Sequence, residues 1–247
     1  MTVSLSTPAA TAIPGAAAAV RAEKLTKAID DKTILKDINL DISAGRYVAL
    51  LGANGAGKTT LLKILATLVA PSGGVLKLFG QTVRRDSIHI RSRLGLIGHG
   101  AMLYRDLSAR ENLVFFGRLY GVADAPGRAA ELLKFVDLAP RANDPVKTFS
   151  RGMMQRVSIA RALMHNPDLL LADEPFSGLD APSCRMLEEM LSRLHGQGKT
   201  VVLANHEISQ SLRLAEQAVV LRKGRVVLDE PASSLDPAAV LAEVSAR

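Results

Sequence analysis

A glycine-rich segment that ends in a lysine and two threonines holds the clearest chemistry of this sequence. It fits the pattern G-x-x-x-x-G-K-[ST], whose glycines let the backbone curl until its N–H groups point at phosphate oxygens. A helix that starts at this segment adds positive potential at the same place. The residues expected to surround the phosphate groups of a nucleotide are Gly52, Ala53, Asn54, Gly55, Ala56, Gly57, Lys58, Thr59 and Thr60.

Four side chains are expected to act on the phosphates. Lys58 is expected to pair with the β- and γ-phosphates, and Thr59 to offer its hydroxyl to Mg²⁺. Residues 169–172 form an apolar run that is followed by two carboxylates. Burial of that run as a strand fixes Asp173, which can then hold the same Mg²⁺. Glu174, one residue further on, can orient and deprotonate a water molecule.

The phosphate-binding segment needs a strand before it and a helix after it, and the sequence predicts both. Residues 47–51 are a short apolar run typical of a buried strand. After Gly57, four apolar residues share one helical face at i, i+3, i+4 and i+7, and residues 71–74 end that helix. The four residues are Leu61, Ile64, Leu65 and Leu68.

The rest of the chain predicts an α/β fold. Strands are predicted within residues 21–51 and at 75–79, 94–97, 169–172 and 200–204, and a hairpin at 218–221 and 226–228. Helices are predicted at 182–194 and 208–215. Such alternation implies a P-loop NTPase core with a mostly parallel sheet, accompanied by an antiparallel β subdomain.

Residues 102–166 are predicted to form a helical subdomain inserted into that core. Ser108 and Glu111 form an S-x-x-E capping box at the start of one helix. A second helix is predicted at 129–136, and Ser150 can cap a third.

Composition limits the cellular role. No run of about 20 apolar residues occurs, so any membrane role must come through a partner. Residues 1–20 contain no Lys or Arg, so residues 1–21 are predicted to be a disordered extension rather than a secretory signal. The one cysteine, Cys184, excludes an internal disulfide, agrees with a cytoplasmic location and is expected to pack in the core.

The net charge of +7 raises the question of nucleic-acid or anionic-lipid partners. The basic residues are spread thinly, and no block of five like charges occurs. No nucleic-acid partner is therefore expected.

Three further segments resemble those of one P-loop family. Residues 149–156, Phe-Ser-Arg-Gly-Met-Met-Gln-Arg, resemble the LSGGQ signature of ABC ATPases, and residues 177–180 resemble their D-loop. His206, after the strand predicted at 200–204, matches their switch histidine. All five motifs occur in the family's order, so the sequence resembles an ABC ATPase domain over residues 22–230, with residues 231–247 left as a C-terminal tail.

The resemblance implies a head-to-tail dimer that binds two ATP molecules at its interface. Each ATP would lie between one P-loop and the signature of the second ATPase subunit. Ser150 and the amide of Gly152 would meet the γ-phosphate from that side, and Asp180 of the D-loop would belong to the same site. His206 would contact the γ-phosphate and help to hold the attacking water beside Glu174.

Some positions depart from the family pattern. Arg151 and Met153 replace the usual glycine and glutamine of the signature. Ile29 aligns with the aromatic residue that normally stacks on adenine, so weak adenine discrimination is expected. His99 replaces the Q-loop glutamine; it is expected to reach the nucleotide site and Mg²⁺ or water, and would add a pH-sensitive group.

Three other classes of ABC protein are excluded. The single set of motifs excludes tandem-ATPase forms, the lack of a long coiled-coil insertion excludes SMC-type proteins, and the single cysteine excludes forms with zinc modules. A stand-alone transporter ATPase remains, with transmembrane permease subunits as partners and a location peripheral to the inner face of the membrane. Several short segments resemble the haem exporter ATPase of cytochrome c maturation. These segments are 96–99, 103–104, 111–113, 116, 118–121 and 148–153. ABC-2-type drug or polysaccharide exporters, and a non-transport ABC ATPase acting on nucleic acid, are the alternatives.

Overall fold

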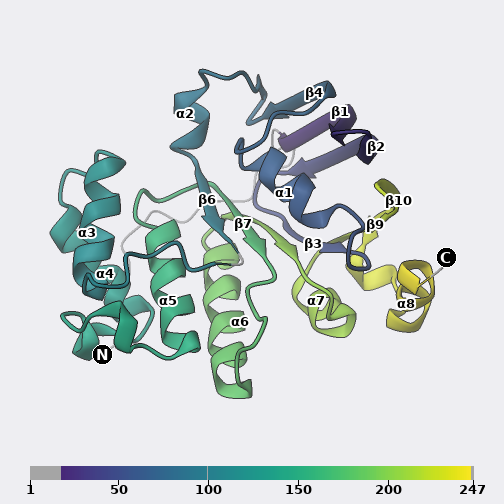
Figure 1. The fold of residues 1–247 in the computed structure, drawn as a ribbon. Helices are drawn as coiled ribbons and strands as arrows, with labels where there is room; N and C mark the ends of the chain where they lie inside the picture. The colour runs from purple at the N-terminus through teal and green to yellow at the C-terminus, as the bar shows by residue number, and fades with distance from the viewer. Residues whose placement is uncertain (1–17, 99, 246–247) are drawn as a thin grey trace.

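Six strands form the larger sheet of the computed structural model, which describes residues 18–98 and 100–245 (Figure 1). The five strands from β9 (Gln217–Arg222) to β6 (Leu94–Ile97) run parallel, and β10 (Arg225–Pro231) is joined to β9 as an antiparallel hairpin. The predicted mostly parallel sheet and the predicted hairpin are confirmed. In spatial order the strands are β10 (Arg225–Pro231), β9 (Gln217–Arg222), β3 (Tyr47–Leu51), β8 (Thr200–Ala204), β7 (Leu169–Asp173) and β6 (Leu94–Ile97).

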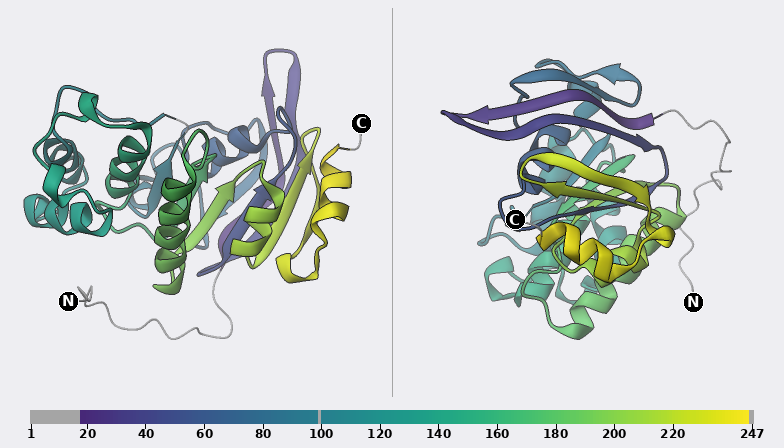
Figure 2. Two further views of the ribbon diagram at one scale, coloured as in Figure 1. Left: turned by 90° about the horizontal axis from the view of Figure 1, so that it is seen from below. Right: turned by 90° about the vertical axis from the view of Figure 1, so that its right-hand side faces the viewer.

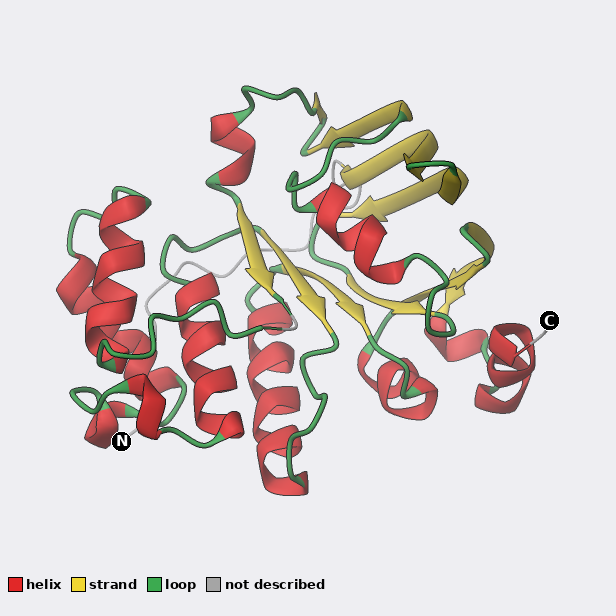
Figure 3. Cartoon of the chain, viewed as in Figure 1, coloured by secondary structure: helices red, strands yellow, loops and turns green. Residues whose placement is uncertain are grey.

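The central strands are buried on both faces because helices cover the sheet from two sides (Figure 3). Leu170 and Val201 face one core with α5 (Arg151–Ala162) and α6 (Ala181–Gly196). Their neighbours Leu171 and Val202 face the other core, with α1 (Lys58–Leu65). The alternation has the period of two that a strand requires.

A second, antiparallel sheet has the order β2-β1-β4-β5 and packs over α1. Its strands are β1 (Ala18–Ile29), β2 (Lys32–Ser43), β4 (Gly73–Leu78) and β5 (Gln81–Thr82). The β1–β2 pair extends past the neighbouring elements (Figure 2). The disordered extension predicted for residues 1–21 is wrong for residues 18–21, which belong to β1 and include the buried Val20. Residues 1–17 lie outside the described part.

The insertion between β6 and β7 consists of helices, as predicted. It contains α3 (Ala109–Leu119), α4 (Ala125–Phe135), α5 and short 3₁₀ turns at Ala139–Arg141 and Val146–Thr148. The capping box of Ser108 and Glu111 is present at the start of α3, and Ser150 caps α5. Helix α4 begins before the predicted residue 129 because Asp124 accepts a hydrogen bond from the amide of Gly127.

The predicted apolar face of α1 is wrong at its last residue. Helix α1 ends at Leu65, so Leu68 leaves that face and is 60% exposed. The segment predicted as a C-terminal tail, 231–247, contains a 3₁₀ turn (Ala232–Ser234) and α8 (Pro237–Ser245). Val240 is fully buried there, and α8 lies beside β9 (Figure 2).

The remaining helices are α2 (Ile88–Arg91) and α7 (Ile208–Leu214). Within residues 18–98 and 100–245, no helix is long and apolar enough to span a bilayer. Cys184 is partly buried against the core of α5 and α6, where the sequence placed it.

Two side chains attach the edge strand β6 to the helical subdomain: Arg161 in the last turn of α5 and His165 just after that helix ends. Arg161 donates a hydrogen bond of 2.7 Å to the carbonyl oxygen of Leu96, and a ring nitrogen of His165 lies 2.8 Å from the carbonyl oxygen of Leu94. The guanidinium carbon of Arg161 also lies 5.3 Å from the ring centre of Phe116 in α3. These contacts cover the free edge of β6 immediately before residues 98–102.

The imidazole of His165 also stacks on Tyr120, with ring centres 3.9 Å apart. Burial lowers the pKa of His165; the hydrogen bond to the Leu94 carbonyl opposes this, and the charges of Arg161 and Lys199 add to the lowering. The native protein therefore binds fewer protons at this site than the unfolded chain does. Its contribution to stability is complete above the ordinary histidine pKa and is lost as the pH falls below it.

We expect His165→Phe to flatten the pH dependence of stability. The variant keeps a ring against Tyr120 but cannot titrate, so its free energy of unfolding should fall less than that of the wild type between pH 7.5 and 5.5. Urea titrations at both pH values measure this. Leu119→Phe, at a 70% exposed position of α3, is the control: it adds a ring but changes no titrating group, so it should keep the wild-type slope. Equal slopes in wild type and His165→Phe would contradict the assignment.

Candidate functional site

The phosphate-binding segment curls between β3 and α1, and two of its glycines make close contacts with neighbouring strands. A Cβ atom on Gly52 would lie 2.4 Å from the carbonyl oxygen of Leu221, and one on Gly57 would lie 2.7 Å from the side chain of Leu35. Gly57 also has a φ of 111° at the N-cap of α1, which favours glycine. The amide of Gly224 donates to the carbonyl oxygen of Ala56 at 3.0 Å, so the β9–β10 turn supports the segment.

Lys58 lies within this curl and is 5% exposed. Its ammonium group donates to the carbonyl oxygens of Gly52 at 2.7 Å and Ala53 at 3.1 Å. Burial lowers the pKa of Lys58, and the negative charges of Glu174 and Asp173 oppose that lowering. The lysine is thus a positive charge held at the start of α1 by backbone oxygens.

Thr59 and Asp173 meet although 114 positions separate them. The Thr59 hydroxyl donates to a carboxylate oxygen of Asp173 at 3.2 Å. Asp173 is the last residue of β7 and is 8% exposed. Oxygen donors of this kind suit Mg²⁺, which keeps several waters and bridges to substrate phosphates instead of using an all-protein cage. Among the described residues, no group of three His, Cys, Asp or Glu side chains suited to a metal occurs.

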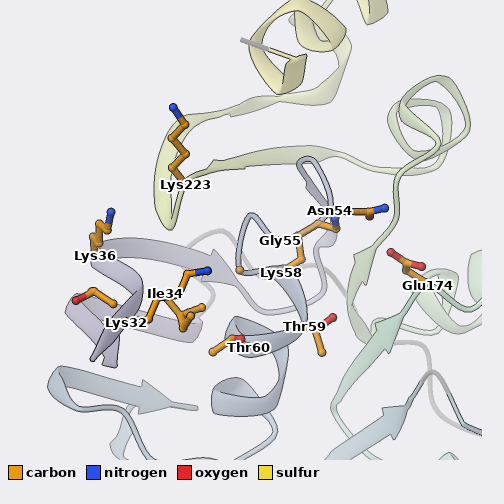
Figure 4. Close-up of a pocket in the computed structure, with 12 residues that line it drawn as sticks. Lys32, Ile34, Lys36, Asn54, Gly55, Lys58, Thr59, Thr60, Glu174 and Lys223 are labelled. Carbon is orange, nitrogen blue, oxygen red and sulfur yellow. The ribbon is translucent and has the colours of Figure 1, made fainter. Parts of the chain in front are cut away.

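Glu174 leaves the sheet through a left-handed backbone conformation, with a φ of 48°. Its amide donates to the carbonyl oxygen of Ala204 at 2.9 Å, which fixes the turn against β8. The side chain then points into the cavity that contains Lys58 and Thr59 (Figure 4). Non-glycine residues in this conformation are often found at functional sites.

These residues share a cavity of about 600 Å³. Seven of the predicted site residues line it, together with five residues that the sequence analysis did not select. The lining residues are Lys32, Thr33, Ile34, Lys36, Asn54, Gly55, Gly57, Lys58, Thr59, Thr60, Glu174 and Lys223. The signal for Lys223 was its place beside Gly224 in the hairpin turn, but a turn by itself does not reveal which loop it touches.

The signature and D-loop residues form a second cluster, and none of them lines the cavity. Ser150 caps α5 and Asp180 caps α6; hydrogen bonds from Ser183 lower the pKa of the Asp180 carboxyl. A Cβ atom on Gly152 would lie 2.6 Å from the Ser183 hydroxyl, so the two helix starts touch.

Arg151, the departure from the signature pattern, packs over Gly178. A Cβ atom on Gly178 would lie 2.4 Å from the Arg151 guanidinium, and Gly178 has a φ of 68°. The arginine therefore joins the signature segment to the D-loop segment within one chain.

His206 follows β8 and is exposed. Its backbone amide donates to the side-chain oxygen of Asn205 at 2.9 Å, and its ring lies 3.6 Å from the Glu207 carboxylate. Asn205 is 1% exposed and is held by Gln210, so it positions this turn, a role that the sequence analysis missed. His99 lies outside the described residues.

The chain matches a family described as ABC transporter over residues 35–177. It is 35% identical to the linearmycin resistance ATP-binding protein LnrL of Bacillus subtilis, with 84% of this chain and 68% of the relative covered. It is 37% identical to the Nod factor export ATP-binding protein I of Cupriavidus pinatubonensis, with coverages of 90% and 69%.

Solved structures are similar as well. A dimeric structure of the bacterial ABC transporter cassette MJ0796 superposes with a TM-score of 0.79 at 30% identity, covering 86% of this chain and 98% of that one. The structure of cbiO1 from Clostridium perfringens, part of the transporter complex cbiONQ, also gives 0.79, at 26% identity, with coverages of 92% and 91%.

Proposed function

The chain belongs to the ABC transporter family of ATP-binding, ATP-hydrolysing subunits, and from that premise we propose that it drives export through separate membrane-spanning subunits. The observation that carries the proposal is the cavity in which Lys58, Thr59 and Glu174 meet at the end of the parallel sheet. Similarity to proteins named for linearmycin resistance and Nod factor export supports the export direction.

In the proposed mechanism, the amides of residues 52–60 and the ammonium of Lys58 hold the phosphate chain of ATP. Thr59 and Asp173 would hold Mg²⁺, which supplies charge neutralisation at the phosphate oxygens when bound. The carboxylate of Glu174 would orient a water molecule and take its proton as the water attacks the γ-phosphorus. The bond from that phosphorus to the β,γ-bridging oxygen would break, so that ADP and phosphate are the products. Positioning and charge stabilisation account for most of the catalysis of phosphoryl transfer.

We propose that the active site is completed by a second ATPase subunit arranged head to tail. Ser150, Gly152 and Asp180 lie at the starts of α5 and α6, outside the cavity of their own chain. The amide-rich N-terminus of α5 would bind the γ-phosphate held by the partner's P-loop. His206 would contact the same phosphate beside Glu174, and His99 would reach Mg²⁺ or water from the segment after β6.

Two classes of transported substrate are candidates. Residues 96–99 and 148–153 resemble the haem exporter ATPase of cytochrome c maturation, which favours haem export. The relatives described above are named for other exports, so an exporter of drug or polysaccharide type is the second candidate. A non-transport role on nucleic acid is the least favoured, because the basic residues do not form a block.

The permease is proposed to dock near residues 102–104, at the cytoplasmic side of the membrane. Met102 is 49% and Tyr104 51% exposed. Beside them lies a groove of about 450 Å³ that Leu103 and Arg151 help to line. Exposed apolar side chains at a groove are typical of an interaction surface. Leu103 is partly buried against the helical core, and the ring of Tyr104 packs on Phe115 and Phe116 of α3. Met102 and the exposed part of Tyr104 therefore remain to contact a partner.

Glu174→Gln tests the general base. The variant should bind ATP with wild-type affinity, lose hydrolysis by at least about a hundredfold, and accumulate an ATP-bound dimer. ATP binding, phosphate release and size-exclusion chromatography measure the three effects. Lys58→Ala is the contrasting control, since it should lose binding as well. Hydrolysis near the wild-type rate in Glu174→Gln would remove this residue from the role.

A mixed dimer tests the composite site. Neither Lys58→Ala nor Ser150→Arg should hydrolyse ATP as a homodimer. Mixing the two should restore activity, because one site then combines an intact P-loop with an intact signature. Specific activity of the wild-type chain should likewise rise with protein concentration. Activity that is independent of concentration in a proven monomer would contradict the dimer.

A Met102→Asp, Tyr104→Asp double variant tests the docking surface. It should remain folded and bind ATP, yet detach from membranes and lose transport, because the two charges oppose burial against an apolar partner. Co-purification with the permease measures this, and Ile88→Asp, at a 72% exposed position of α2, is the control. Full co-purification of the double variant would place docking elsewhere, and loss of its thermal unfolding transition would show that the residues serve the local core.

A further inference from the structure

The nucleotide cavity has a second wall beyond the phosphate-binding segment. Strand β2 supplies Lys32, Thr33, Ile34 and Lys36, and the β9–β10 turn supplies Lys223. A nucleotide whose phosphates occupy residues 52–60 must place its ribose and base along this wall, because the other lining residue, Glu174, lies on the opposite side (Figure 4). The side chains of this wall therefore determine how the site contacts the ribose and the base.

The wall is fixed relative to the phosphate-binding segment. The amide of Lys36 donates to the carbonyl oxygen of Gly224 at 2.7 Å, while the amide of Gly224 donates to Ala56 at 3.0 Å. A Cβ atom on Gly224 would lie 2.1 Å from the carbonyl oxygen of Ile34, so the turn lies directly on β2. Lys36 and Lys223 consequently start from backbone positions set by the same contacts that shape the phosphate site.

The wall carries uncompensated positive charge. Four lysines and one glutamate line the whole cavity. Among the ion pairs between described residues, none involves Lys32, Lys36 or Lys223. Figure 4 shows Lys36 and Lys223 on different elements, both on the side of the cavity away from Glu174. Such cations attract a phosphate chain whatever base it carries.

The wall offers little that could identify a base. None of the twelve lining residues is aromatic, and Ile29, at the end of β1, is 50% exposed and does not line the cavity. The one amide side chain of the lining, Asn54, points toward Glu174 and away from Lys36 (Figure 4). Stacking on an aromatic ring, and hydrogen bonds with an amide or to a carboxylate, are the usual means of holding a base.

We propose that Lys36 and Lys223 are affinity-determining residues that contact the polyphosphate and ribose end of the nucleotide, and that the site binds nucleoside triphosphates with little regard to the base. This rests on the proposed function, which places the triphosphate on residues 52–60. The ligand class is a Mg²⁺-bound triphosphate; ATP is bound because it is a triphosphate rather than because it carries adenine.

Equilibrium binding with the full chain and Mg²⁺ tests the proposal. ATP, GTP and inorganic tripolyphosphate should each displace a fluorescent ATP analogue, with affinities within roughly tenfold of one another. The Lys36→Ala, Lys223→Ala double variant should bind all three roughly tenfold more weakly, since exposed charge contacts are individually modest, and its affinity should depend less on salt. Lys134→Ala, at an exposed position of α4, is the matched control and should change nothing.

A gain-of-function variant gives an independent measurement. Ile29→Tyr, which adds a ring next to the wall, should strengthen ATP and GTP binding by roughly tenfold and leave tripolyphosphate binding unchanged. The proposal is overturned if ATP binds more than a hundredfold tighter than GTP in the wild type, or if the double lysine variant binds like the wild type. Lys58→Ala distinguishes failure of this proposal from failure of the proposed function. Unchanged nucleotide binding in that variant would overturn the placement of the phosphates on residues 52–60, and with it the proposed function.

Discussion

The curl of the phosphate-binding segment between β3 and α1 is the constraint on which the rest of this structure depends. Gly52 approaches the backbone of Leu221 in β9 too closely for a side chain, and Gly57, with a φ of 111°, packs against the side chain of Leu35 in β2. The segment thereby brings the two sheets to one place, with α1 between them. Once the curl is fixed, the positions of Lys58 and Thr59 follow, and so do those of the strands that face them.

The parallel sheet explains why the remaining groups gather at the same edge. Asp173 ends β7, and His206 follows β8, and both strands run in the direction of β3. Parallel strands bring their carboxyl ends together, and ligands of open α/β sheets bind there. The signature cluster is built differently, from the starts of α5 and α6. In the proposed head-to-tail dimer, this separation of the two clusters within one chain would make hydrolysis depend on assembly.

The sequence alone determined the features that are made by neighbours along the chain. The G-x-x-x-x-G-K-[ST] segment, the capping box of Ser108 and Glu111, the cap at Ser150 and the buried run before Asp173 were all predicted and are present as elements. Each depends on contacts within a few residues or on a short apolar pattern. The roles assigned to these residues in ATP hydrolysis came from the resemblance to ABC ATPases and stay predictions.

Only the tertiary structure decided which distant segments meet. The sequence could not show that Lys36 and Lys223 share a wall, that Arg151 packs over Gly178, or that Asn205 positions His206, because each depends on backbone placed by other elements. It likewise missed residues 18–21 and α8: a strand is stabilised by its partner strand, and a short apolar helix by the surface it covers. The local sequence pattern determines whether a segment forms a helix or a strand. Which segments lie beside it is determined by how the two sheets pack against α1.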